Sequence, residues 1–211
     1  MSLTLHVGSK RYSSWSLRPY LALAHAGATF ETHTILLDRD DTRAQIAAVA
    51  PAGRVPVLHD GALVVWDSLA ICEYVAERFP AAGLWPADPA RRATARSISA
   101  EMHAGFAALR RDMPMDVDAV DKRGQGHTAE ALADARRVIA IWKEQLAAHG
   151  GPFLFGAFTI ADAMFAPVTT RFTTYGVDLD PACRAYVEAV AALPAMISWC
   201  ADAAREPRTR P

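Results

Sequence analysis

The chain has few cysteines, no excess charge of either sign and no long apolar run. Its cysteines, Cys72, Cys183 and Cys200, lie far apart and form no CxxC pair, which argues against a disulfide framework or a zinc site. We therefore expect reduced thiols in a cytoplasmic protein. With 22 basic against 23 acidic residues, the net charge of −1 gives no electrostatic reason to bind nucleic acid or an anionic membrane.

Several common motifs are absent as well. No apolar run approaches the roughly 20 residues that span a bilayer. The start, MSLTLHVGSKRYSS, has no apolar core behind basic residues, so no secretory signal is expected. The seven histidines are scattered without an HExxH motif, so no metal is expected. The lack of GxSxG, Walker and GxGxxG motifs disfavours serine hydrolases, P-loop enzymes and dinucleotide-binding enzymes.

The first half of the chain alternates between strand-like and helix-like segments. SLTLHV, residues 2–7, alternates polar and apolar residues as a strand does, and a run of helical spacing follows from about Ser14 to Ala26, before Gly27. The order β-α-β-α-β-β-α predicts a compact α/β layer with a four-stranded mixed sheet. The other segments are a strand over 30–37, a helix over 42–50, a hairpin over 55–66 that turns at Asp60-Gly61, and a helix over 68–79 with Ser68 as its N-cap.

The composition changes at about residue 81. AAGLWPADP, residues 81–89, is rich in glycine and proline and predicts a linker, and no convincing strand follows it. The second half is therefore predicted to be a helical bundle. Its predicted helices run from Asp88-Pro89 to about Arg111, from Thr128 to Ala148, from a Thr159–Asp162 capping box to Phe172, from Asp180-Pro181 onward, and after Pro194, with loops at Met113-Pro114 and over 121–128.

The stretch YSSWSLRP places serines where a strand passes into a helix. Ser13 and Ser14 fall at the positive end of that helix, whereas Ser16 falls inside it. A helix N-terminus favours an anion by about 0.3–1 kcal/mol, up to about 2 when partly buried. A hydroxyl that donates to a charged acceptor adds about 1.5–3 kcal/mol, and lowering a thiol pKa by two units needs about 2.7 kcal/mol. One serine and the helix could thus hold a bound thiol as thiolate; the alternative is that the serines only cap the helix.

Two other pairs are suited to a peptide ligand. Val55-Pro56 opens the hairpin, and if its peptide bond is cis, the Val55 N–H and C=O could turn outward and pair with an extended peptide. Asp67 and Ser68 begin the next helix, where a carboxylate suits an ammonium group while a hydroxyl and free N–H groups suit a carboxylate. Taken singly, a strand-entry proline and a simple helix cap explain these pairs as well.

In their order and spacing, YSSWSLRP, GRVPVL, WDSLAICEYVAERFP and FTIADAMFAPV resemble the glutathione transferases over nearly the whole chain. The resemblance implies a thioredoxin-like glutathione-binding domain over 1–80, a linker over 81–89 and an all-helical domain over 90–211 that forms the electrophile site. It also implies glutathione as cosubstrate, a hydrophobic electrophile as the second substrate, no metal, and a homodimer. The branches that it most resembles are the serine-using zeta-like and theta-like ones of bacterial type.

The resemblance assigns roles to the paired residues. Val55 would bond the cysteinyl backbone of glutathione beside a cis Pro56, and Asp67 with Ser68 would hold the γ-glutamyl group, with Asp where Glu is commoner. Asp162 would belong to a capping box that serves folding.

The catalytic hydroxyl stays open between neighbouring serines. The zeta-type SSxS match points to Ser13, and theta-type spacing counted back from Arg18 points to Ser14. Tyr12 is less suitable because it lies further toward the strand. Trp15 stands where a cysteine-using branch has its cysteine, so mixed-disulfide chemistry is not expected.

Basic residues are candidates for the rest of the site. Arg54 and Arg39 are candidates for the glycine carboxylate of glutathione, although Arg39 has an equally good explanation as a solvated surface residue. The candidates for the electrophile site are Trp15, His103, Phe106, Arg110 and Met113.

We therefore predict a transferase in which the glutathione thiolate attacks an electrophilic carbon. One alternative is a glutathione-dependent cis-trans isomerase that acts on a dicarboxylate such as maleylacetoacetate. The other is a non-catalytic transferase-like domain used for interactions.

Overall fold

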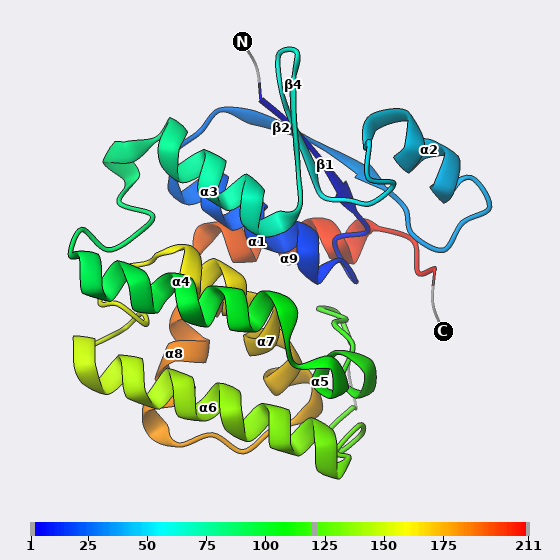
Figure 1. Cartoon of the computed structure of the whole chain (residues 1–211). Helices are drawn as coiled ribbons and strands as arrows, with labels where there is room; N and C mark the ends of the chain where they lie inside the picture. The colour runs from blue at the N-terminus through cyan, green and yellow to red at the C-terminus, as the bar shows by residue number, and fades with distance from the viewer. Residues whose placement is uncertain (1–2, 120–121, 210–211) are drawn as a thin grey trace.

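The computed structural model describes residues 3–119 and 122–209 (Figure 1). The strand predicted from Ser2 and the loop predicted from Asp121 therefore begin outside the described residues. The first part of the chain forms a four-stranded sheet in the order β2-β1-β3-β4, with β1 parallel to β2 and β3 antiparallel to both β1 and β4. Its elements are β1 (Leu3–Gly8), α1 (Ser14–His25), β2 (Phe30–Ile35), α2 (Thr42–Val49), β3 (Val57–Asp60), β4 (Leu63–Trp66) and α3 (Ser68–Arg78).

Alternation along the strands sends apolar side chains to both faces of the sheet. Leu5 and Leu58 are fully buried in the main core with α1 and α3. Val57, the neighbour of Leu58, points the opposite way and packs with Ile35 and Ile46, so α2 covers the second face. The predicted thioredoxin-like order β-α-β-α-β-β-α is confirmed.

The rest of the chain is helical, and it packs closely against the first part. A short 3-10 turn, Pro80–Ala82, leads to α4. The helix α7 is buried along most of its length, and α1, α4 and α7 share one continuous apolar core, while α9 returns beside α1 (Figure 1). The helices are α4 (Pro89–Ala104), α5 (Ala107–Asp112), α6 (Ala129–His149), α7 (Ile160–Tyr175), α8 (Pro181–Ala191) and α9 (Pro194–Arg205).

Two local predictions were wrong. The helix predicted from Pro89 to about Arg111 is interrupted, because Gly105 is extended and Phe106 has a φ of 61°. A Cβ on Gly105 would come within 2.9 Å of the Glu101 carbonyl oxygen, so only glycine allows this close approach. The N-cap of α3 is Asp67, and Ser68 is the first residue of the helix.

The predicted capping box at the start of α7 is present. Thr159 and Asp162 exchange side-chain to backbone hydrogen bonds, and Asp162 also accepts the Leu154 N–H at 3.0 Å. Asp162 is fully buried, and this burial raises its pKa to about 6. Within the described residues no single helix is long and apolar enough to cross a membrane; α8 and α9 would pass that test only as a pair, and they are bent by 68°.

Candidate active site

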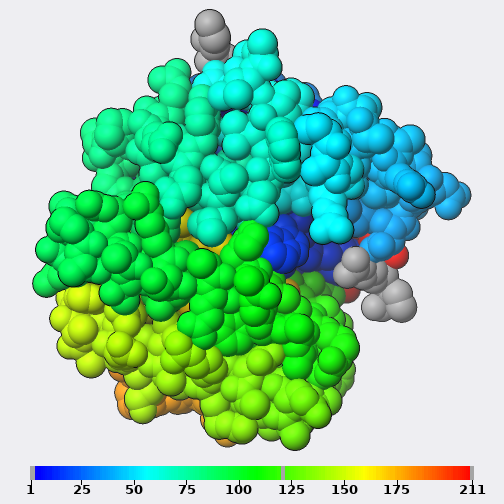
Figure 2. Space-filling view, in the orientation of Figure 1, coloured from blue at the N-terminus to red at the C-terminus, as the bar shows by residue number. Residues whose placement is uncertain are grey.

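Two adjoining cavities open between the sheet and the helical part. The first has a volume of about 560 Å³ and the second about 390 Å³, and both are lined by Trp15, Arg54 and Val55. In Figure 2 the surface is hollowed between the cyan and green segments, and blue atoms of the N-terminal part lie at the bottom of this hollow. The first cavity is further lined by Ala52, Pro56, Trp66, Asp67, Ser68 and His103, and the second by Tyr12, Ser13, Ser14, Leu37, Ile46, Gly53, Arg110, Pro114, Met115 and Arg171.

The two candidate serines differ in what they bond. Ser13 is the N-cap of α1: its Oγ accepts the Ser16 N–H at 3.3 Å and lies 2.7 Å from the Ser16 Oγ, which in turn accepts the Gly8 N–H at 3.0 Å. Ser14, the first residue of α1, lines the second cavity and is 5% exposed, and its hydroxyl bonds to no other described residue. The Ser13 hydroxyl therefore caps the N-terminus of α1, whereas the Ser14 hydroxyl is available to a ligand.

Val55 and Pro56 lie where an extended peptide could pair. The Val55–Pro56 peptide bond is cis. The strand β3 begins only at Val57, and among the described residues the Val55 backbone takes part in none of the turn and loop hydrogen bonds. Since Val55 also lines both cavities, its N–H and C=O are candidates to bond a ligand backbone.

Asp67 has an unusual backbone and bonds in two directions. Its φ is 73°, in the left-handed region that non-glycine residues seldom adopt and that is common at functional sites. The carboxylate accepts the Leu69 and Ala70 N–H groups at the start of α3, and its other oxygen lies 3.2 Å from the His103 Nε2 of α4. Burial lowers the pKa of His103, the Asp67 charge opposes this, and Arg18 and Arg110 add to the lowering.

Arg18 is a buried cation whose place beside the site the sequence did not indicate. It is fully buried and donates to the Ser68 Oγ at 3.4 Å, while its Nε and Nη2 have no hydrogen-bond partner among the described residues. Desolvation lowers its pKa well below the ordinary value, and the charges of Arg110 and Arg171 lower it further. The guanidinium lies 4.4 Å from the centre of the Trp15 ring, a cation–π contact.

The Trp15 ring contacts two guanidinium groups. Arg110 lies 4.9 Å from the centre of the same ring, and His103 meets it edge-on at 5.1 Å. Arg110 lines the second cavity, and no Asp or Glu lines that cavity beside it. Trp15, Arg110 and His103 are thus brought together from α1, α5 and α4.

Arg171 is a site residue that sequence reasoning missed. It lines the second cavity, is 4% exposed, and donates to the Met113 carbonyl at 2.8 Å and to the Pro167 carbonyl at 3.4 Å. Burial lowers its pKa to about 9. The clue in the sequence is a single arginine within the apolar helix α7.

Other predicted residues lie elsewhere. Phe106 and Met113 are buried in the core and line neither cavity. Arg39 is exposed and also lines neither cavity, whereas Arg54 lines both. Within residues 3–119 and 122–209, no cluster of His, Cys, Asp and Glu side chains is arranged to hold a metal ion.

The fold and the site can be compared with known proteins. The N-terminal domain of glutathione S-transferases matches residues 12–78 of the chain, and the C-terminal domain of glutathione S-transferases matches residues 125–189. The maleylacetoacetate isomerase of Pseudomonas aeruginosa is 30% identical over 197 residues, which is 87% of this chain and 89% of that protein. The chain belongs to the glutathione S-transferase family.

Other members of the glutathione S-transferase family are similar over most of their length. The probable maleylacetoacetate isomerase of Caenorhabditis elegans is 29% identical over 80% of this chain and 79% of its own. A glutathione transferase homolog from Burkholderia, solved with bound glutathione, is 24% identical, covers 98% of this chain and 100% of its own, and superposes with a TM-score of 0.75. This likeness supports the fold, in which a thioredoxin-like part precedes a helical part.

Proposed function

We propose that this family member is a serine-type glutathione transferase with Ser14 as the thiolate partner. The observation that carries the proposal is the free Ser14 hydroxyl at the N-terminus of α1, beside the cis Val55–Pro56 bond. The thiol gives its proton to solvent as glutathione binds, and the hydroxyl and the helix N-terminus stabilise the thiolate. The thiolate then forms a carbon–sulfur bond with the electrophile, and the leaving group departs with the electron pair.

The first cavity suits the peptide part of glutathione. Asp67 would hold the γ-glutamyl ammonium and Ser68 its carboxylate, while Arg54 is the remaining candidate for the glycine carboxylate. The domain limits 1–80, 81–89 and 90–211, a cytoplasmic homodimer and a role in detoxification belong to the same proposal. The cysteines support the cytoplasmic location, since Cys72, Cys183 and Cys200 are all free thiols.

Calorimetry of glutathione binding, together with the ultraviolet absorbance of the complex, tests the proposal directly. Glutathione should bind, and the bound form should absorb in the ultraviolet as thiolate near neutral pH. S-methylglutathione, which keeps the peptide but has no ionisable thiol, should bind without that absorbance. Absence of binding at millimolar glutathione would contradict the proposal.

A second candidate is the glutathione-dependent isomerase of a dicarboxylate. Arg110 and Arg171 favour it, because they line the second cavity without an acidic neighbour there. The relative from Pseudomonas aeruginosa is named maleylacetoacetate isomerase, and that from Caenorhabditis elegans is named probable maleylacetoacetate isomerase. In this reaction the thiolate would add to the double bond, the bond would rotate, and the thiolate would leave again, so glutathione is regenerated.

The arginines permit a controlled comparison of the two candidates. Arg110→Met should raise the KM for maleylacetoacetate about tenfold, the effect of losing about 1.4 kcal/mol of binding, and should change the KM for a neutral aromatic halide little. Arg111→Met is the matched control, since Arg111 is 65% exposed and pairs with Asp112. If both substrates respond alike to Arg110→Met, the arginine does not select for carboxylates.

A further inference from the structure

The loop between β1 and α1 buries two basic residues directly before the serines. Lys10 is 7% exposed and Arg11 is 2% exposed. Buried charges are costly unless they are paired. The Lys10 Nζ lies 2.5 Å from the Asp202 carboxylate, and Arg11 donates to the Asp118 carboxylate and, at 2.9 Å, to the Ala203 carbonyl.

The main chain of this loop is also held by distant segments. The Glu206 carboxylate accepts the N–H of Lys10 at 3.0 Å and that of Arg11 at 3.4 Å. The Lys10 carbonyl accepts the Trp199 Nε1–H at 2.8 Å, and the Arg11 carbonyl accepts the Val117 N–H at 3.2 Å. Every backbone polar group of Lys10 and Arg11 is therefore bonded by α9, by the segment after it, or by the loop that follows α5.

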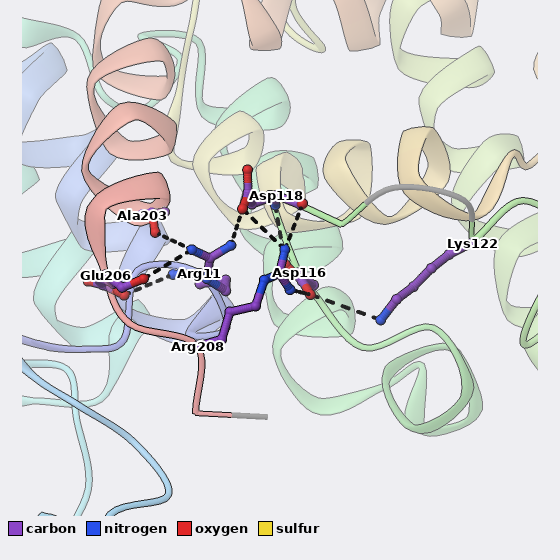
Figure 3. Close-up of polar contacts among 7 residues, drawn as sticks. All are labelled: Arg11, Asp116, Asp118, Lys122, Ala203, Glu206 and Arg208. Atoms are coloured by element: carbon purple, nitrogen blue, oxygen red, sulfur yellow. Dashed lines mark hydrogen bonds and ion pairs between the residues drawn. The ribbon is translucent and has the colours of Figure 1, made fainter. Parts of the chain in front are cut away.

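Arg208 ties these two distant segments to each other. Its Nη2 donates to the Asp118 carboxylate at 3.2 Å and to the Asp118 carbonyl at 3.1 Å, and its Nη1 lies 3.4 Å from the Asp116 carboxylate. Figure 3 shows Arg11 and Arg208 both meeting Asp118, with Glu206 on the other side of Arg11. We call Arg11, Asp118, Glu206 and Arg208 the C-terminal clamp.

We propose that the C-terminal clamp positions the Ser14 hydroxyl, so that the end of the chain helps to set the acidity of the bound thiol without touching glutathione. The inference rests on the proposed function for the role of Ser14. Only Tyr12 and Ser13 separate Arg11 from Ser14. Because hydrogen bonds weaken over a few tenths of an ångström, a loop that is loosened at Arg11 holds Ser14 less well at the thiolate.

Glu206→Gln tests the clamp with little change in shape. The amide carries no charge and has an NH2 donor in place of one of the two oxygens, so it cannot offer each loop N–H its own acceptor oxygen as the carboxylate does. We expect faster amide hydrogen exchange over residues 10–16. We also expect the pKa of the bound thiol to rise by about half a unit and kcat to fall about threefold at a pH below that pKa, with unchanged affinity for S-methylglutathione.

Glu188→Gln is the matched control, because it makes the same change in charge on the exposed face of α8 and should alter none of these quantities. Unchanged exchange and an unchanged thiol pKa in folded Glu206→Gln would overturn the proposal. If Glu206→Gln does not fold, Arg208→Gln takes its place, since that side chain is 49% exposed. If wild type shows no bound thiolate but the amide hydrogens of residues 10–16 still exchange faster in the clamp variant, the proposed function is contradicted. The anchoring of the loop by the clamp is then still supported.

Discussion

Replacing Ser14 by alanine should remove thiolate stabilisation while leaving helix α1 intact. The Ser14 hydroxyl bonds to no other described residue, and the capping bonds of α1 come from Ser13. Serine and alanine differ little in size, so the 5% exposed side chain should leave no large cavity when it is shortened. The free energy of unfolding should therefore change by less than about 1 kcal/mol.

The expected effect on the thiol follows from a single charge-assisted hydrogen bond. Such a bond contributes about 1.5–3 kcal/mol, and each pKa unit corresponds to about 1.36 kcal/mol. The pKa of the bound glutathione thiol should accordingly rise by about one to two units in Ser14→Ala. Below both pKa values, the thiolate fraction and kcat should fall about 10-fold to 100-fold.

The assay is a pH titration of the thiolate absorbance in the glutathione complex, with urea unfolding in parallel. Ser13→Ala should give the opposite pattern: a loss of about 0.5–2 kcal/mol of stability from the missing N-cap and a small change in thiol pKa. A large pKa rise in Ser13→Ala with none in Ser14→Ala would refute the assignment. A rise in neither would mean that backbone N–H groups alone stabilise the thiolate.

Two further predictions concern the acids Asp67 and Asp162. Asp67→Asn keeps a good N-cap but removes the charge, so glutathione should bind about tenfold more weakly, a loss of about 1.4 kcal/mol. Desamino-glutathione, which lacks the ammonium group, should bind wild type and Asp67→Asn equally. Calorimetry measures both affinities. Burial raises the pKa of Asp162 from 3.8 to about 6, so the folded state binds the extra proton. The free energy of unfolding of wild type relative to Asp162→Asn should thus fall as pH rises from about 4 to about 6, by up to about 3 kcal/mol. Urea unfolding at several pH values measures this, and a difference that grows with pH would contradict it.

The order of elements was predictable because each segment carries its own signal. Alternating polar and apolar residues indicate β1, Gly27 follows the end of α1, and Asp60-Gly61 indicates the turn of the hairpin. The break between α4 and α5 was missed because helical spacing continues on both sides of it. The clue was Gly105, whose effect depends on how closely its Cα approaches the Glu101 carbonyl, a distance that periodicity does not contain.

The sequence could indicate candidate residues where neighbours in the chain lie together, as Val55-Pro56 and Asp67-Ser68 do along the first cavity. A residue could not be assigned to the site from the sequence where tertiary packing decides whether its side chain lines a cavity. Arg171 would be taken for a solvated residue in most helices, and only its burial in α7 makes it part of a cavity. Within the C-terminal clamp, Arg11 and Glu206 are 195 positions apart in the sequence, so no local sequence pattern indicates their contact.

The buried arginines couple the electrostatics of the two cavities. Arg18 is fully buried, Arg18 and Arg110 both contact the Trp15 ring, and Arg171 lines the same second cavity as Arg110. Like charges in a region of low dielectric raise one another's cost, which is why the pKa of Arg18 falls further through Arg110 and Arg171. Their field and the N-terminus of α1 have the same sign. A thiolate at Ser14 and a carboxylate at Arg110 would therefore each relieve this repulsion, so in the proposed function the same cations would favour both ionised glutathione and an acidic second substrate.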